Sequence, residues 1–129
     1  MNAAAALYQF WSSFDLPAYE SNSVPTGEAA PKMPYLTYDV VVGTFSADTA
    51  LFASLWYEDG DGVSALLDGT NKADEICEKI GRSGARIYCD NGAIWLRLGQ
   101  PKYQVIGDPT KDTVKQITMN FTASFLTSV

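Results

Sequence analysis

Near its C-terminal end the chain reads VKQITMNFTASFL over residues 114–126, with apolar and polar side chains in alternation. One set of alternate positions is apolar and the other is polar: Ile117, Met119, Phe121, Ala123 and Phe125 against Gln116, Thr118, Asn120, Thr122 and Ser124. A period of two is typical of a β-strand that buries one face. We therefore expect a long antiparallel strand whose second face meets solvent.

The segment before this strand predicts a hairpin. Residues 85–89 and 93–98 flank Asn91-Gly92, a pair that tolerates the positive φ angles of a two-residue turn. Residues 99–112 then read as a long connection with a short strand at 103–106.

A second hairpin is predicted earlier in the chain. Residues 35–43 and 50–57 are rich in β-branched and aromatic side chains, and residues 44–49 suit a hairpin loop. In the second of these strands one face carries Leu51, Ala53, Leu55 and Tyr57, and the other carries Phe52 and Trp56. Both faces are apolar, so we expect one to meet a helix and the other a partner chain.

Two segments have the spacing of amphipathic helices. Residues 3–13 are rich in alanine and place one apolar stripe, consisting of Ala3, Leu7, Phe10, Trp11 and Phe14. Residues 64–80 place a second stripe, consisting of Leu66, Leu67, Ala73, Ile76, Cys77 and Ile80. Gly69 predicts a break near residues 68–70, and Gly81 is placed to end the helix.

Residues 18–34 contain Pro25, Gly27, Pro31 and Pro34 and read as a long irregular arm. A connection of this length within a small domain is usually functional. The 129 residues predict a single domain of the α+β class, with a mainly antiparallel sheet of four to six strands and two helices packed on it.

The composition narrows the possible functions. The chain has no histidine, which removes catalytic triads and zinc sites that depend on it. Residues 59–62 read Asp-Gly-Asp-Gly, but Val63, Ser64 and Thr70 occupy the following positions where a calcium loop needs ligands and a glycine. We expect no catalytic, cofactor-binding or metal-binding residues, and no enzyme activity.

Charge and cysteine content bound the partners. The net charge of −6 disfavours tight binding to nucleic acid. Cys77 and Cys89 are expected to be buried thiols rather than a disulfide. No apolar run reaches the length of a membrane span, and residues 3–7 lack the flanking charge of a signal peptide.

Three further groups have a structural and a functional interpretation. Asp74 and Glu78 lie one helical turn apart and are expected to form a solvated helix face rather than an acid–base pair. The densest cations are expected on the surface, where they could also contact phosphate or an acidic partner: Arg82, Arg86, Arg97 and Lys102. The tryptophans are expected in core or interface packing, with a ligand pocket as the alternative: Trp11, Trp56 and Trp95.

Five segments appear in an order and at a spacing that resemble a known family. They are residues 16–20 (LPAYE), 34–38 (PYLTY), 53–57 (ASLWY), 92–96 (GAIWL) and 117–123 (ITMNFTA). This set is similar to the small tail terminator, or tail completion, proteins of long-tailed phages and prophages of Gram-positive bacteria. The resemblance spans nearly the whole chain, but residues 58–70 are longer, more acidic and richer in glycine than the corresponding family stretch.

The resemblance implies an α+β structural protein of the virion, without catalysis. It implies a homo-oligomeric ring, a hexamer in this family, that caps the head-proximal end of the tail tube and docks to the neck of the capsid. The implied partners are the tail tube protein, the head–neck connector and DNA that passes through the ring without sequence-specific binding. The implied location is the cytoplasm of the bacterial host during assembly and then the virion tail.

Subunit or neck contacts are expected in the two long connections, residues 20–34 and 99–112, and on the second apolar strand face. The residues expected there are Tyr19, Glu20, Val24, Phe52, Trp56, Lys102 and Tyr103. Two alternatives remain at this point: a head-completion or neck protein, and a small-molecule-binding α+β domain that uses its tryptophans.

Overall fold

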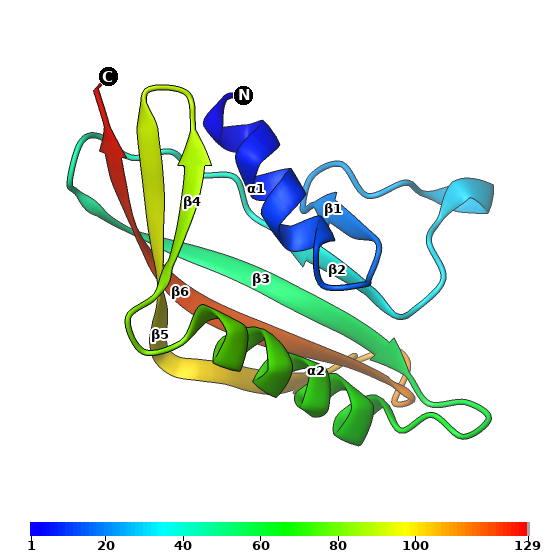
Figure 1. Cartoon of the computed structure of the whole chain (residues 1–129). Coiled ribbons are helices and arrows are strands. Elements are labelled where there is room, and N and C mark those ends of the chain that lie inside the picture. Colours follow the sequence, from blue (N-terminus) through cyan, green and yellow to red (C-terminus); the bar gives the residue numbers. More distant parts are fainter. Residues whose placement is uncertain (129) are drawn as a thin grey trace.

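Six strands form one curled sheet, and both α-helices pack on the same face of it in the computed structural model, which describes residues 1–128 (Figure 1). The elements in chain order are α1 (Ala3–Ser12), β1 (Ala18–Glu20), the 3-10 turn η1 (Gly27–Ala29), β2 (Tyr35–Tyr38), β3 (Asp48–Glu58), α2 (Ala65–Ile80), β4 (Ala85–Cys89), β5 (Gly92–Gly107) and β6 (Val114–Thr127). The strand order is β1-β2-β3-β6-β5-β4, and every pair except β1–β2 is antiparallel. The predicted α+β class is confirmed.

Strand β6 lies at the centre of the sheet and confirms the alternation seen in the sequence. Ile117, Met119, Phe121, Ala123 and Phe125 are buried under the helices. Their polar neighbours point to the opposite face and are only partly covered, apart from Ser124, which is buried. Burial of one face therefore sets the register of β6 against both of its neighbours.

The predicted hairpin of β4 and β5 is present, but its turn lies one residue earlier than expected. Cys89 pairs with Gly92, so the two loop residues are Asp90 and Asn91. Asn91 has a φ of +67° and Gly92 one of +155°. A Cβ at Gly92 would lie 2.0 Å from the carbonyl oxygen of Leu126, so β6 can approach only a glycine at this position.

Strand β5 is much longer than the sequence predicts. The predicted short strand at residues 103–106 is present as part of β5, but the rest of the expected connection at residues 99–112 is wrong, because β5 runs to Gly107 and only residues 108–113 link it to β6. The register shifts between Leu98 and Tyr103, and the side-chain amide of Asn120 donates a hydrogen bond of 2.8 Å to the carbonyl of Pro101 within this bulge. Pro101 and Lys102 in the bulge interrupt the sequence pattern that would otherwise indicate one continuous strand.

The N-terminal half also differs in its boundaries. Residues 18–20 form β1, which lies parallel to β2, so the irregular arm is confined to residues 21–34. Strand β2 ends at Tyr38 and β3 starts at Asp48, so the predicted loop at 44–49 is wrong and residues 39–47 form the connection. Within this connection Phe45 forms a bridge with Phe125, and Val40 packs against the core.

Helix α2 is continuous, and the predicted break near residues 68–70 is wrong. Ser64 caps it by accepting a hydrogen bond of 3.2 Å from the amide of Leu67, and the carboxylate of Asp59 accepts one of 2.7 Å from the amide of Ala65. Its buried stripe consists of Ala65, Gly69, Ala73, Ile76, Cys77 and Ile80. Leu66 and Leu67, predicted to be buried, are 47% and 62% exposed, because the stripe is centred on Gly69.

Helix α1 buries Leu7 and Trp11 against the sheet, as its stripe predicts. The Trp11 and Phe121 rings are 5.4 Å apart, and Phe14 packs beside them. No helix within residues 1–128 is long and apolar enough to cross a membrane.

Candidate functional site

The face of the sheet opposite the helices is the main candidate site, and we call it the open face. No helix or strand among residues 1–128 covers it (Figure 1). Pairing across β2, β3 and β6 places the following side chains on it: Tyr35, Thr37, Phe52, Ser54, Trp56, Gln116, Thr118 and Asn120. Thr37 and Ser54 are nevertheless buried within this face, at 8% exposure each, so their hydroxyls need hydrogen-bond partners.

Three aromatic rings line one end of the open face. The Tyr19 and Tyr35 rings meet edge to face with centroids 6.0 Å apart, and Tyr35 stacks on Trp56 at 6.2 Å. The indole N–H of Trp56 donates a hydrogen bond of 2.9 Å to Thr37 Oγ1. Burial, and secondarily Tyr19, raises the pKa of Tyr35. These contacts fix the orientations of the three rings.

Beside the rings, a polar row satisfies itself across β3 and β6. The Gln116 side-chain amide donates a hydrogen bond of 2.9 Å to Ser54 Oγ, which lies 3.4 Å from Thr118 Oγ1. Tyr35, Trp56, this row and Val24 line a shallow, open hollow of about 460 Å³. Phe52 lies at its rim with 43% of its surface exposed. The hollow is broad and mixed in polarity, which suits a protein surface better than an enclosed small ligand.

The structure brings together four of the seven residues expected in contacts. Tyr19 stands against Tyr35, and Val24, Phe52 and Trp56 line the hollow. Alternation along β3 correctly placed Phe52 and Trp56 away from the helices. Thr37 and Gln116, which hold this surface together, were missed, because their role depends on pairing between distant strands.

Glu20 does not join this group. Its carboxylate accepts a hydrogen bond of 2.8 Å from the backbone N–H of Asn22 and one of 3.1 Å from the Asn22 side chain. It also accepts one of 3.1 Å from the Ser23 hydroxyl. It therefore shapes the turn that starts the arm. Lys102 and Tyr103 also lie outside this group, because they belong to β5.

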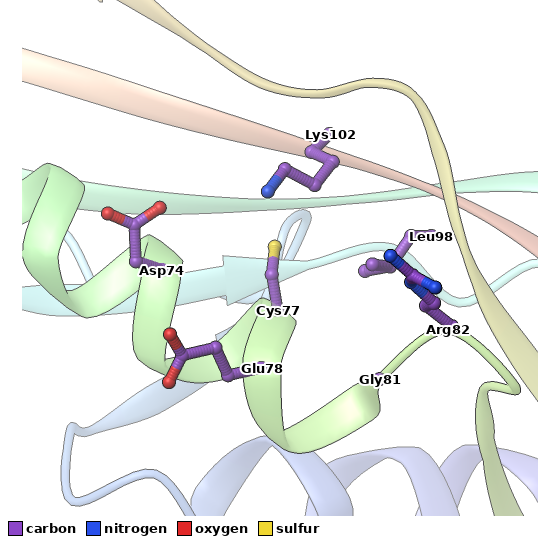
Figure 2. A pocket seen from close by; sticks show the side chains of 7 residues that line it. All are labelled: Asp74, Cys77, Glu78, Gly81, Arg82, Leu98 and Lys102. Carbon is purple, nitrogen blue, oxygen red and sulfur yellow. The ribbon is translucent and has the colours of Figure 1, made fainter.

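Lys102 lines a small hollow between α2 and β5, of about 190 Å³, which Figure 2 shows from close by. The side chains of Asp74 and Lys102 flank the Cys77 sulfur there, and Arg82 and Glu78 lie at its rim. The Tyr103 hydroxyl donates a hydrogen bond of 2.8 Å to Asp74, and this bond raises the pKa of Tyr103.

Cys77 has the environment of an inert thiol. Burial raises its pKa, and the nearby Lys102 only partly opposes that effect. A nucleophilic cysteine needs the opposite shift. Both cysteines are free thiols; the predicted burial is confirmed for Cys77 and is only partial for Cys89.

Among the cations, Arg97 has a structural role. Its guanidinium donates hydrogen bonds of 2.9 Å to Asp48 and 2.6 Å to Ser124, and Ser124 donates one of 2.7 Å to Asp48. It also lies over the Trp95 ring at 4.3 Å. This network accounts for the burial of Ser124 and lowers the pKa of Asp48, with Ser124 as the larger cause.

The three tryptophans do not share a site. Trp11 is in the core, Trp56 is on the open face, and Trp95 donates a hydrogen bond of 2.8 Å to the carbonyl of Ser83. A pocket built from all three is therefore wrong. The acidic turn at residues 59–62 serves α2 through Asp59, and no group of metal-ligating side chains lies together within residues 1–128.

Comparison with known proteins adds the fold alone. Neither a family model nor a curated protein matches the chain. A solved structure of a protein whose name states no function aligns with 95% of this chain and 93% of its own, at a TM-score of 0.55 and 16% sequence identity. At that identity the similarity extends to the α+β architecture and not to an activity.

Proposed function

We propose that this chain is a structural virion protein, a tail terminator that caps the head-proximal end of the tail tube of a long-tailed phage and joins it to the head. The observation that carries the proposal is the open face, where Tyr35, Phe52 and Trp56 lie on a sheet surface without a covering layer. Rigid aromatic side chains on an uncovered sheet are typical of protein–protein contact. The ordered sequence segments supply the particular setting, a tail end.

The arm supports the same role. Residues 21–34 leave the sheet between β1 and β2 and project from the body (Figure 1). Most of these side chains are exposed. A segment with so little packing of its own gains surface contacts when it lies along a neighbour. In a cap that must hold both a tube and a neck, such an arm provides a second contact surface.

The net charge of −6 is compatible with a ring through which DNA passes. A surface of the same sign as the phosphate backbone does not retain the DNA. The functional chemistry in this proposal is association, and no step requires a reacting side chain.

Localisation on the particle tests the proposal. Antibodies raised against the chain and coupled to gold should label virions of the encoding phage at the junction between head and tail. Label at the distal tip of the tail or on the capsid shell would contradict the proposal. Label on connector-bearing heads that have never met a tail would instead support a neck protein.

A further inference from the structure

The second half of β5 is an unpaired strand edge. Strand β4 pairs with β5 only as far as Leu96, opposite Ala85. Beyond that point β5 has β6 on one side and, within residues 1–128, no strand on the other. An open edge presents backbone donors and acceptors that can pair with another chain.

Part of this edge lacks the features that usually block such pairing. Pro101, Lys102 and the bulge protect its start. Residues 103–107 read Tyr-Gln-Val-Ile-Gly, with no proline and no charge. Val105 and Ile106 are 39% and 42% exposed. An apolar strand edge without proline or charge can pair with a strand of another chain.

Apolar side chains flank the edge on both sides of the sheet. On the helix side, Val105 lies opposite the buried Ile117 of β6 and is itself 39% exposed. On the open face, Ile106 and Trp56 line a hollow of about 150 Å³. An added strand would therefore find apolar contacts above and below it.

The charges of the two sheet edges are opposite. Residues 81–107, around the β4–β5 edge, hold four cations and one acid: Arg82, Arg86, Arg97 and Lys102 against Asp90. Within residues 1–128, only Arg97 of these cations makes an ion pair, with Asp48, although Asp74 and Glu78 of α2 lie near Lys102 and Arg82. Residues 15–39, around the β1 edge, hold four acids and one cation: Asp15, Glu20, Glu28 and Asp39 against Lys32.

We propose that a second copy of this chain docks its β1 edge and arm, residues 18–34, on the β5 edge at residues 103–107. Arg82 and Lys102 would then face Glu20 and Glu28 of the next copy. Because the two edges lie at opposite ends of the sheet order, the contact is heterologous and repeats from copy to copy. The inference rests on the proposed function, since it names the contact that closes the ring.

Charge reversal and mixing test this contact. Variant A carries Arg82→Glu and Lys102→Glu, and variant B carries Glu20→Lys and Glu28→Lys. We expect wild type to associate at millimolar concentration and low salt in sedimentation equilibrium, and each variant alone to associate at least about tenfold more weakly. Mixed in equal amounts, A and B should recover wild-type association, because both edges then meet opposite charge.

Controls and contrary results are well defined. Asp61→Lys and Asn71→Glu change the charge at exposed positions away from both edges and should associate like wild type. Urea unfolding establishes that A and B are folded before they are compared. A wild-type chain that stays monomeric, a variant that associates normally, or a mixture that fails to recover would each overturn the contact. A further variant carries both Lys102→Asp and Asp108→Lys in one chain. If this variant associates like wild type while the mixture of A and B does not, the contact forms instead between the β5 edges of two copies. None of these results affects the localisation experiment, so the contact can fail while the proposed function stands.

Discussion

Gly69 of α2 lies directly against Ile117 of β6: a Cβ built on Gly69 would come within 2.4 Å of the Ile117 Cδ1 atom. The helix therefore approaches the sheet most closely at the residue that, on propensity alone, should interrupt it. Ile117 is fully buried and has little room to move. This contact fixes which side of α2 faces the sheet, and so leaves Leu66 and Leu67 exposed.

Gly69→Ala should therefore destabilise the protein, although alanine favours a helix by about 1 kcal/mol over glycine. Overpacking costs about 1–3 kcal/mol, so a net loss of about 1 kcal/mol is expected in urea unfolding. In an Ile117→Val background, which removes Cδ1, the same substitution should become neutral or stabilising. A Gly69→Ala chain that is more stable than wild type would show that the helix and sheet are not in this contact.

The exposed Phe52 should contribute to joining rather than to folding. Phe52→Ser should change the free energy of unfolding by less than about 1 kcal/mol, because the side chain is at the rim of the open face. In an assembly reaction with tails and heads, the same variant should join fewer particles. Phe121→Ala is the matched control, since loss of that buried ring should cost about 3–5 kcal/mol. Normal joining of heads and tails by the folded Phe52→Ser chain would show that the open face does not take part in joining.

The Asp48 network should make stability depend on pH at the acid end. The pKa of Asp48 is lowered below its ordinary value of 3.8 by Ser124 and Arg97. Its contribution is therefore present above that ordinary value and is lost as the pH falls through the lower folded value. Asp48→Asn should be less stable than wild type at neutral pH, and the difference in urea midpoint should shrink as the pH falls below the ordinary value of 3.8. A difference that does not change with pH would contradict the pairing, and Asp61→Asn is the exposed control.

The two cysteines should differ in reactivity. Burial raises the pKa of the Cys77 thiol, whereas Cys89 is only half-buried. Iodoacetamide at neutral pH should modify Cys89 in the folded chain and spare Cys77, and should modify both in urea. Peptide mass spectrometry gives the result. Faster modification of Cys77 would mean that the α2–β5 hollow activates its thiol.

The sequence predicts those parts of the fold in which one face is buried and the other is exposed to solvent. Strand β6 is the clearest case, because its period of two reflects its burial. In the second half of β5 only residues 103–106 are predicted as a strand, since both faces of this half are largely exposed and Pro101 interrupts the pattern. Strand β1 is only three residues long and is defined by its parallel pairing with β2.

The candidate site divides in the same way. Alternation in β3 predicted the outward faces of Phe52 and Trp56. Their partners could not be predicted, because Tyr35, Thr37 and Gln116 come from strands whose register depends on tertiary contacts. The open β5 edge is likewise a property of strand order and not of any local pattern.

Inactivation of the gene in its phage or prophage, followed by electron microscopy of the induced lysate, tests the central claim most directly. A tail terminator ends tube growth and joins tube to head, so its loss should leave filled heads and separate tails of irregular length, and expression of the chain in trans should restore joined particles. Joined, infectious virions with tails of normal length in the absence of the chain would contradict the assignment.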